Sequence, residues 1–385
     1  MRVSPTFEQM VALVPAPAQP INWEALTGLF PQLKDLATTP QDPKHHGEGD
    51  VWTHTKLVCE ALLTLPVYVS ADSERQFVLF YGALFHDIAK PACTVQEPDG
   101  RITSAGHSKR GAVDTRIVLW KAGVPFLTRE RICRIIANHQ IPFFAIKGNR
   151  SGDTAEFIAR KLSCELSILE LTAIAEADIL GRVCNDAQSI LDDIELFREV
   201  AREDGCFDAP RAFPDAHTRL SYFRTKGAIS PDFSFFQEVG SSVIVLSGLP
   251  ASGKDTWVAA NYPGLPVISF DDAREALGLK HGSNSGAAVH LAIDNAKALL
   301  RQKAPFIWNA THLSTQMRNK TLDLLFGYNA EVSLVYLENS EATIKSRNTK
   351  RDTTLTNGAI DKMLYRWEAP LPTEAHVVSY VTNFA

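Results

Sequence analysis

The sequence has no long hydrophobic run and no closely paired cysteines, and both absences narrow the class of protein. Its apolar runs fall far short of the ~20 residues that span a bilayer, and its N-terminus lacks the continuous apolar core of a signal peptide. The six cysteines never form a C-x-x-C pair, and none follows position 206: Cys59, Cys93, Cys133, Cys164, Cys184 and Cys206. This spacing argues against a disulfide framework or a zinc–thiolate site and fits reduced thiols. We therefore expect a cytoplasmic protein that does not associate with membranes.

The composition is that of a soluble globular protein with more than one domain. At 385 residues the chain is too long for one ordinary core, so two or three domains are expected. Hydrophobic residues make up 45% of the chain and charged residues 22%, with a formal net charge of −5. That charge argues against a protein that coats nucleic acid by bulk attraction, but it is compatible with a local basic site for a strand end.

The spacing of apolar residues changes along the chain. In the first half they recur at helical spacing in five segments: 51–65, 73–87, 129–139, 154–162 and 166–180. Later, short β-rich runs alternate with helical stretches, at 242–247, 266–270, 305–309 and 331–337, which is typical of a parallel sheet covered by helices. The segment between them contains Pro210, Pro214 and Pro231 and shows no sustained period. We therefore predict an all-α domain at 22–203, a linker at 204–240 and an α/β domain with a parallel sheet at 241–385.

A glycine-rich loop follows the first β-rich run. The residues VLSGLPASGKDTW at 245–257 place a strand before the pattern G-x-x-x-x-G-K and a helix after it. In this context backbone N–H groups turn inward around a β-phosphate, the helix N-terminus adds a positive dipole, and Lys254 reaches the β- and γ-phosphates. A chance turn with the same letters is the alternative. The predicted nucleotide-binding residues are Gly248, Ser252, Gly253, Lys254, Asp255 and Thr256.

Asp255 stands where such loops usually carry a magnesium-binding Ser or Thr. Either the hydroxyl of Thr256 or the Asp255 carboxylate, acting through water, would provide a hard oxygen ligand instead. We therefore expect the loop to bind ATP or another nucleoside triphosphate together with Mg²⁺.

Two acidic residues and an arginine follow the second β-rich run. The stretch FDDAREAL at 270–277 puts Asp271 and Asp272 at the carboxyl end of a strand, where parallel sheets bind ligands. A carboxylate there can accept a hydroxyl proton during phosphoryl transfer, and Arg274 can clamp a phosphate. The alternative for the two aspartates, stronger for Asp272, is that they cap a helix.

The order of GLPASGKDTW, FDDAREAL, WNATHLSTQMR and KSRNTKR resembles the 5′-hydroxyl polynucleotide kinases over residues 241–385. Beside Lys254 of the loop, the resemblance implies four catalytic residues: Asp271 as general base, Arg274 on the acceptor-strand phosphate, and Arg347 and Arg351 in an arginine lid. A solvated basic face is the alternative for the KSRNTKR run. Two positions differ from the family pattern, because Asp255 replaces Ser or Thr and Asn309 replaces Asp.

Histidine and aspartate gather in the first half of the chain. The stretch GALFHDIAKP puts His86 and Asp87 side by side near the end of an apolar helix, with Lys90 one turn later. Buried side chains of these types need partners, and further candidates occur at His45, His46, His54, His107, His139 and Asp178. Any one of these histidines is more often structural, but together they predict a metal site. Imidazole and carboxylate ligands without thiolate favour Mn, Fe, Co, Ni, Zn or Mg.

The order H…HD…H…H…D resembles the HD-domain metal-dependent phosphohydrolases over residues 22–203, and residues 30–55 are similar to the HD domain of bacterial tRNA nucleotidyltransferases. The resemblance implies that His54, His86, Asp87 and Asp178 bind a first ion, that Asp87 bridges, and that His107 and His139 bind a second. Lys90 and Arg182 would contact the phosphate, and His46 would be either a ligand or a substrate contact. Two ions at bridging distance generate a hydroxide nucleophile and neutralise a phosphate under attack.

A phosphohydrolase in front of a polynucleotide kinase resembles the two-headed end-healing enzymes. This implies removal of a 2′,3′-cyclic phosphate or a terminal 2′- or 3′-phosphate, and ATP-dependent phosphorylation of a 5′-hydroxyl. The implied cofactors are ATP, Mg²⁺ and two divalent transition-metal ions (Mn, Co, Ni or Fe), and the implied partners are RNA or DNA ends and a downstream ligase. Two alternatives remain: a nucleotidase or phosphodiesterase fused to a small-molecule kinase, and a switch protein whose nucleotide-bound loop is a sensor.

Overall fold

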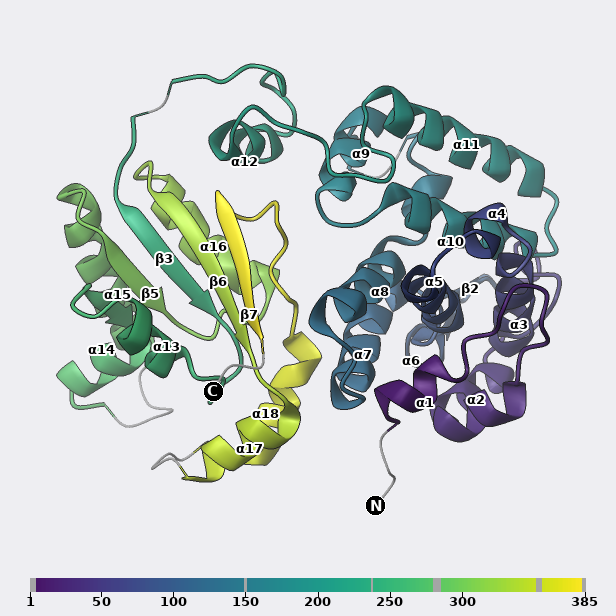
Figure 1. The fold of residues 1–385 in the computed structure, drawn as a ribbon, viewed down its shortest axis with the longest axis horizontal. Helices are drawn as coiled ribbons and strands as arrows, with labels where there is room; N and C mark the ends of the chain where they lie inside the picture. Colours follow the sequence, from purple (N-terminus) through teal and green to yellow (C-terminus); the bar gives the residue numbers. More distant parts are fainter. Residues whose placement is uncertain (1–4, 149–150, 237, 280–284, 351–354, 383–385) are drawn as a thin grey trace. The chain divides into compact units, whose positions relative to one another are not determined.

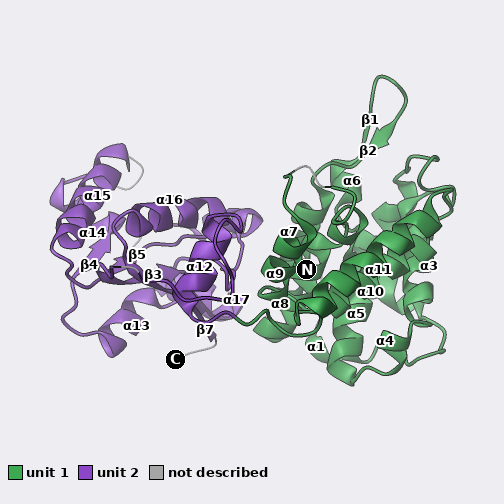
Figure 2. Cartoon of the chain, turned by 90° about the horizontal axis from the view of Figure 1, so that it is seen from above, with its two compact units in different colours: residues 1–212 green, residues 213–385 purple. Residues whose placement is uncertain are grey.

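The computed structural model describes residues 5–148, 151–236, 238–279, 285–350 and 355–382. The chain forms two compact units, residues 1–212 and 213–385 (Figure 2). The first unit is helical and the second is an α/β domain with a parallel sheet, so the predicted fold class is confirmed.

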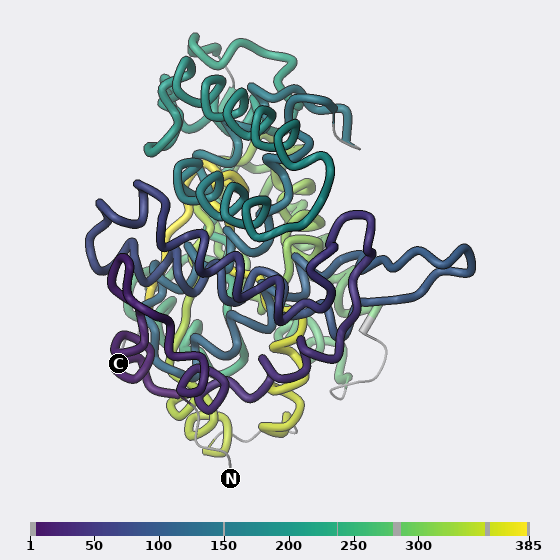
Figure 3. Tube along the Cα trace, turned by 90° about the vertical axis from the view of Figure 1, so that its right-hand side faces the viewer, coloured from purple at the N-terminus to yellow at the C-terminus, as the bar shows by residue number. Residues whose placement is uncertain are grey.

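Unit 1 consists almost entirely of helices (Figure 1). Its α-helices are α1 (Phe7–Val11), α2 (Trp23–Leu29), α3 (Val51–Leu62), α4 (Pro66–Val69), α5 (Ser73–Phe85), α6 (Lys90–Cys93), α7 (His107–Lys121), α8 (Phe126–Asn138), α9 (Ala155–Ser163), α10 (Ile168–Leu180) and α11 (Ala187–Glu203). Two 3-10 helices accompany them, η1 (Pro31–Thr38) and η2 (Ile141–Phe143). The all-α prediction missed one feature, a short antiparallel hairpin of β1 (Val95–Gln96) and β2 (Ile102–Thr103) that projects from the helices (Figures 2 and 3).

Helix α5 is the centre of unit 1. Its N-terminus is capped by Asp72, whose side chain accepts from the Arg75 backbone N–H, and every residue from Phe77 to Phe85 is buried. A helix that is apolar all round must be surrounded by others, and α3, α8 and α10 pack against it. The helix ends at Phe85, so His86 and Asp87 emerge directly into the middle of the unit.

Helices α3 and α10 approach each other closely at Gly181, the residue that ends α10. A Cβ atom added there would lie 2.7 Å from the backbone nitrogen of Val58 on α3. Real Cβ atoms do not come this close to backbone, so only glycine allows the two helices to pack at this spacing.

We expect Gly181→Ala to destabilise the protein by ~1–3 kcal/mol, because α10 must move away from α3 to relieve the overlap. Thermal unfolding of the full chain measures the effect. Gly28→Ala is the matched control, since a Cβ on this residue of α2 meets nothing within 4 Å and alanine favours a helix. An unchanged melting temperature for Gly181→Ala would show that the contact is easily relieved.

Unit 2 is built on one five-stranded sheet (Figure 1). The strands are β3 (Ser242–Ser247), β4 (Val267–Ser269), β5 (Phe306–Asn309), β6 (Glu331–Glu338) and β7 (Val377–Thr382), in the spatial order β4-β5-β3-β6-β7 with every pair parallel. The helices are α12 (Ala216–Arg224), α13 (Lys254–Asn261), α14 (Phe270–Ala276), α15 (Ser285–Arg301), α16 (Thr315–Phe326), α17 (Glu341–Lys350) and α18 (Asn357–Met363), with the 3-10 helix η3 (Leu364–Arg366).

Apolar side chains cover both faces of this sheet. On one face, Val243 and Val245 of β3 pack with α15 and α16, and on the other face Ile244 and Leu246 pack with Val258 of α13. Because β3 lies in the centre and all strands run the same way, the segments that follow β3, β4 and β5 meet at one edge of the sheet.

The structure corrects three details of the sequence analysis. The segment 204–240 is not irregular throughout, because it contains α12, whose N-cap is Asp215 directly after Pro214, and the two units divide between Ala212 and Phe213. Strand β7 was missed altogether. The N-cap of α14 is Ser269, whose side chain accepts from the Asp272 N–H, so neither aspartate of the pair is the cap.

None of the helices within the described residues combines the length and the hydrophobicity needed to cross a membrane.

Candidate metal centre and phosphate-binding loop

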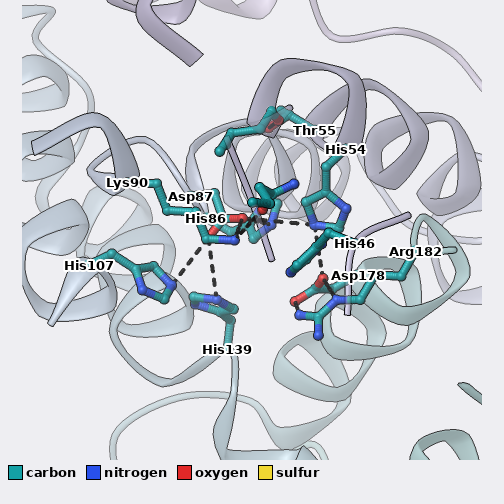
Figure 4. A network of polar contacts seen from close by, with 12 residues as sticks. His46, His54, Thr55, His86, Asp87, Lys90, His107, His139, Asp178 and Arg182 are labelled. Carbon is teal, nitrogen blue, oxygen red and sulfur yellow. Dashed lines mark hydrogen bonds and ion pairs between the residues drawn. The ribbon is translucent and has the colours of Figure 1, made fainter. Parts of the chain in front are cut away.

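The six predicted metal ligands of unit 1 lie together and are all buried (Figure 4). They come from five places in the fold: His54 on α3, His86 and Asp87 at the end of α5, His107 at the start of α7, His139 after α8, and Asp178 on α10. Residues more than 120 positions apart in the sequence are therefore brought to one point by the packing of helices around α5.

The Asp87 carboxylate is the centre of this cluster. Its Oδ2 lies 3.2 Å from His86 Nε2 and 3.8 Å from His54 Nε2. Its Oδ1 lies 3.2 Å from His107 Nε2 and 4.0 Å from His139 Nε2. Each carboxylate oxygen thus faces its own pair of histidines, which is the arrangement that a bridging ligand between two ions requires.

Three of the histidines are fixed in one tautomer by their own backbone. The Nδ1 atoms of His86, His107 and His139 each contact a carbonyl oxygen three residues earlier, that of Ala83 at 2.7 Å, Ser104 at 2.7 Å and Ile136 at 2.8 Å. A carbonyl oxygen can only accept, so Nδ1 carries the proton and Nε2 presents its lone pair to the centre. Metal-binding histidines are commonly oriented in this way.

Several polar atoms of the cluster lack hydrogen-bond partners among the described residues. They are both ring nitrogens of His54, His86 Nε2, His139 Nε2 and Asp87 Oδ1, all of them fully buried. Burying such atoms unpaired is costly, whereas a divalent cation would satisfy them together. His46, Glu48 and His54 form one set of possible ligands, and two further sets share Asp87: His54, His86 and Asp87, and Asp87, His107 and His139. The donors therefore fit two metal ions.

Two basic residues pair with the two carboxylates. Lys90 Nζ lies 2.7 Å from Asp87 Oδ2 and donates to Gln41 Oε1, also at 2.7 Å. Arg182 donates to both oxygens of Asp178 at 2.9 Å, and Asp178 Oδ1 lies 3.1 Å from His54 Nε2. The predicted phosphate contacts Lys90 and Arg182 are thus both at the centre.

The pKa values of three buried groups suit metal binding, whereas the pKa of His86 is raised, because the effect of burial is outweighed by Asp87. Burial by itself raises the pKa of Asp87, but His86 and Lys90 hold that pKa well below its usual range. Burial likewise opposes ionisation of Asp178, whose pKa is held low by Arg182 and His54. Burial lowers the pKa of His139 to about 3. Near neutral pH both carboxylates are therefore ionised and this imidazole is neutral.

His46 lies beside the cluster and contacts a residue that the sequence analysis missed. Its ring is edge-on to His54, with centroids 4.8 Å apart, and its Nδ1 bonds Glu48 Oε1 at 2.8 Å. Burial lowers the pKa of His46 to about 4. Glu48 and Gln41 belong to the same loop as His46, and the stretch QDPKHHGE was the only sequence signal for them. The predicted candidate His45 is exposed.

The phosphate loop of unit 2 has the backbone that its sequence predicts. Gly248 has φ +152° and Gly253, the N-cap of α13, has φ +100°. A Cβ on Gly248 would lie 2.3 Å from the carbonyl oxygen of Leu337, so the loop requires glycine there. Lys254 folds back across the loop, and its Nζ donates to the carbonyl oxygens of Gly248 and Leu249 at 3.0 and 2.9 Å.

The lid residue Arg347 reaches this loop. It lies in the last turn of α17, and its guanidinium contacts the carbonyl oxygen of Ser252 at a distance of 3.5 Å. The same oxygen also accepts a hydrogen bond from the Asn339 side chain at 3.1 Å. The Ser252 side chain is buried. The second predicted lid arginine, Arg351, lies outside the described residues.

The remaining predicted kinase residues lie at the carboxyl edge of the sheet or beside it. Asp271 and Arg274 form an ion pair in α14, immediately after β4. Asn309 ends β5 and donates to Asp255 Oδ1 at 2.7 Å, so the two residues that depart from the family pattern contact each other. Thr256, next to Asp255 on α13, is exposed. The edge thus offers carboxylates next to the phosphate loop, as a magnesium-dependent site requires.

Comparisons with known proteins match separate parts of the chain. The model of a family described as "AAA domain" matches residues 243–370. The C-terminal unit contains a P-loop domain. Among solved structures, a sugar kinase from a Janibacter species is 19% identical, covering 37% of this chain and 85% of that one with a TM-score of 0.29. A gluconokinase from Sinorhizobium meliloti is 16% identical, covering 38% and 86% with a TM-score of 0.27.

The N-terminal region is similar to part of a different group of proteins. It is 34% identical over 113 residues to the multifunctional CCA protein of Halorhodospira halophila, covering 29% of this chain and 23% of that protein. The corresponding protein of Pasteurella multocida is 33% identical over 106 residues, covering 28% and 24%. The chain thus spans about a quarter of the length of these relatives.

Proposed function

We propose that this protein heals broken nucleic-acid ends with two active sites. Unit 1 would open a 2′,3′-cyclic phosphate or remove a terminal 2′- or 3′-phosphate, and unit 2 would transfer the γ-phosphate of ATP to a 5′-hydroxyl. The observation that carries the proposal is the presence, in one chain, of a histidine cluster centred on Asp87 and of a phosphate loop with the Asp271–Arg274 pair near its sheet edge. The healed ends would be substrates for a ligase.

In unit 2, each polar group has a defined part in phosphoryl transfer. Lys254 would leave the loop carbonyls, to which it now donates, and bind the β- and γ-phosphates. Asp271 would accept the proton of the 5′-hydroxyl as the new P–O bond forms and the bond to the β-phosphate oxygen breaks, releasing ADP. Arg274, beside Asp271, would hold a phosphate of the acceptor strand. Arg347, which reaches the loop, would stabilise charge on the transferring group.

In unit 1, the chain's own residues would bind and orient the phosphate. Lys90 and Arg182 each carry hydrogen-bond donors next to the cluster, so they would bind phosphate oxygens. His54, His86, Asp87, His107, His139 and Asp178 would hold two divalent ions, which supply a hydroxide nucleophile and neutralise phosphate charge. Hydrolysis would first open a cyclic diester to a monoester and then release inorganic phosphate, leaving a hydroxyl end.

One substrate tests both halves of the proposal. An oligoribonucleotide with a 5′-hydroxyl and a 2′,3′-cyclic phosphate is incubated with ATP and with Mg²⁺, Mn²⁺, Co²⁺ or Ni²⁺, and both ends are mapped. We expect a 5′-phosphate and a 2′,3′-diol. A kinase that acts on a free nucleoside but not on this oligonucleotide would favour the alternative, a nucleotidase or phosphodiesterase joined to a small-molecule kinase. The same assay with a DNA strand that carries a 5′-hydroxyl and a 3′-phosphate distinguishes RNA ends from DNA ends.

Arg274→Ala should raise the Michaelis constant for the oligonucleotide more than that for ATP. Arg274 is proposed to bind the acceptor's phosphate, and a charge-assisted contact of this kind contributes about 1.5–3 kcal/mol, or roughly 10- to 150-fold. Steady-state kinetics with each substrate varied in turn measures the effect, and Arg301→Ala, at the exposed end of α15, is the control. A rise confined to the Michaelis constant for ATP would place Arg274 on the nucleotide instead.

A further inference from the structure

Glu48 contacts three hydrogen-bond donors around the metal centre of unit 1. Its Oε1 lies 2.8 Å from His46 Nδ1 and 2.9 Å from His54 Nδ1, while its Oε2 accepts from the backbone N–H of Val183 at 2.9 Å. The Glu48 side chain is only 2% exposed. None of the six predicted metal ligands is Glu48, and its carboxylate faces the Nδ1 side of His54, away from Asp87.

These contacts link helix α3 to the segment that follows helix α10. His54 is on α3, whereas Val183 directly follows Arg182 at the end of α10, the helix that carries Asp178. A second bond reinforces the junction, from the Gly47 N–H to the Val183 carbonyl oxygen at 2.9 Å. A Cβ on Gly47 would lie 3.0 Å from that oxygen, so glycine lets the loop dock this closely. The loop 46–48 is therefore fixed to α10 and to α3 at once.

The Glu48 carboxylate lies where it favours one tautomer of His54. The other three histidines of the cluster are each held by a backbone carbonyl oxygen three residues earlier. The Nδ1 atom of His54 instead lies 2.9 Å from Glu48 Oε1, a short contact that is not aligned as a hydrogen bond, and a carboxylate only accepts. A proton on Nδ1 therefore faces an acceptor, and in that tautomer the Nε2 lone pair faces Asp87 and Asp178.

We propose that Glu48 is a positioning residue of the metal centre, which orients His54 for the ion that it shares with Asp87 and Asp178. The inference rests on the metal centre in the proposed function. It requires an ionised carboxylate, because three donors surround its two oxygens. Glutamine at this position has one acceptor oxygen, and its amide N–H groups would face a donor. Outer contacts of this kind are worth about 10- to 100-fold in metal affinity.

Metal binding by the full chain tests the proposal without any substrate. Mn²⁺ is titrated into the metal-free protein in the absence of nucleotide, and free Mn²⁺ is measured by electron paramagnetic resonance. We expect Glu48→Gln to weaken Mn²⁺ binding by about 10- to 100-fold and to leave 5′-kinase activity unchanged. Glu60→Gln is the matched control, since Glu60 is exposed on the same helix α3 and should bind Mn²⁺ like the wild type.

Each outcome has a definite meaning. Wild-type affinity in a folded Glu48→Gln variant would overturn the positioning role while leaving the metal centre and the end-healing proposal intact. If the wild type binds no Mn²⁺, or binds it no more tightly than Asp87→Ala does, the metal centre itself would be overturned, and the inference with it. If Glu48→Gln lowers the folded fraction seen by circular dichroism, Glu48→Asp replaces it. Aspartate keeps the charge but is one methylene shorter, so its affinity should fall between those of wild type and Glu48→Gln, and equality with wild type would contradict the role.

Discussion

Asp87→Ala should abolish removal of the 2′,3′-end phosphate and leave 5′-phosphorylation near the wild-type rate. The two oxygens of Asp87 each face a pair of histidines, so its loss removes a ligand from both proposed ions at once. The kinase should be unaffected because it needs only its own nucleotide and magnesium. Mapping both ends of the oligoribonucleotide with a 5′-hydroxyl and a 2′,3′-cyclic phosphate measures both activities in one reaction, which is run with Mg²⁺ and with Mn²⁺, Co²⁺ or Ni²⁺.

Asp99→Ala is the control for this variant, because Asp99 is exposed in the hairpin of unit 1. Phosphate removal that survives Asp87→Ala would show that the histidine cluster is structural, and the end-healing proposal would fail. A folded Asp87→Ala protein without kinase activity would show instead that the two sites depend on each other. Protein stripped of bound metal by a chelator and then returned to buffer with Mg²⁺ should reproduce the Asp87→Ala result, and adding Mn²⁺ should reverse it.

Asp271→Ala should lower the rate of 5′-phosphorylation by ~10²–10⁴-fold, the usual contribution of a general base. Phosphate removal by unit 1 should be unchanged. The effect should appear in kcat, since Asp271 is proposed to act on the reacting hydroxyl and not to bind ATP.

Lys254→Ala should abolish the same activity by a different route, through loss of its contacts to the β- and γ-phosphates.

Asp272→Ala is a close control, because Asp272 is the next residue of α14 and is equally exposed. Its carboxylate does not cap the helix, since Ser269 does, so its removal should change the kinase rate little. If Asp272→Ala lowered kcat as much as Asp271→Ala, the base would be misassigned by one position. If neither did, a group other than this pair would take the proton.

The resemblance to the HD-domain phosphohydrolases named six residues of unit 1 that the structure brings close together. His54, His86 and Asp178 are far apart in the sequence, but each lies on or at the end of an apolar helical segment, and such segments must pack together. Likewise, the strand before Gly248 and the glycines of the loop predicted a backbone that the structure contains.

Contacts made by loops could not be predicted in this way. Glu48 and Gln41 lie in a segment without periodicity, and their roles come from partners at Val183 and Lys90, which the sequence does not pair with them. Helix α12 was missed because its nine residues follow Pro214 and only a few are buried. Contact between Asp255 and Asn309 also depends on β3 and β5 being neighbours, which no local pattern specifies.

The pairing of Asp87 with Lys90 and of Asp178 with Arg182 also determines the charge balance of the metal centre. Each carboxylate already has a cation of the protein beside it, and the imidazoles are uncharged when they bind metal. The formal charges of Asp87, Lys90, Asp178 and Arg182 therefore sum to zero, and two divalent ions held there would keep an excess of positive charge even beside the Glu48 carboxylate. In the proposed function, a bound phosphate group would supply the missing negative charge. Ion binding and phosphate binding would then be cooperative, each strengthening the other by the same factor, and the released phosphate would inhibit this centre.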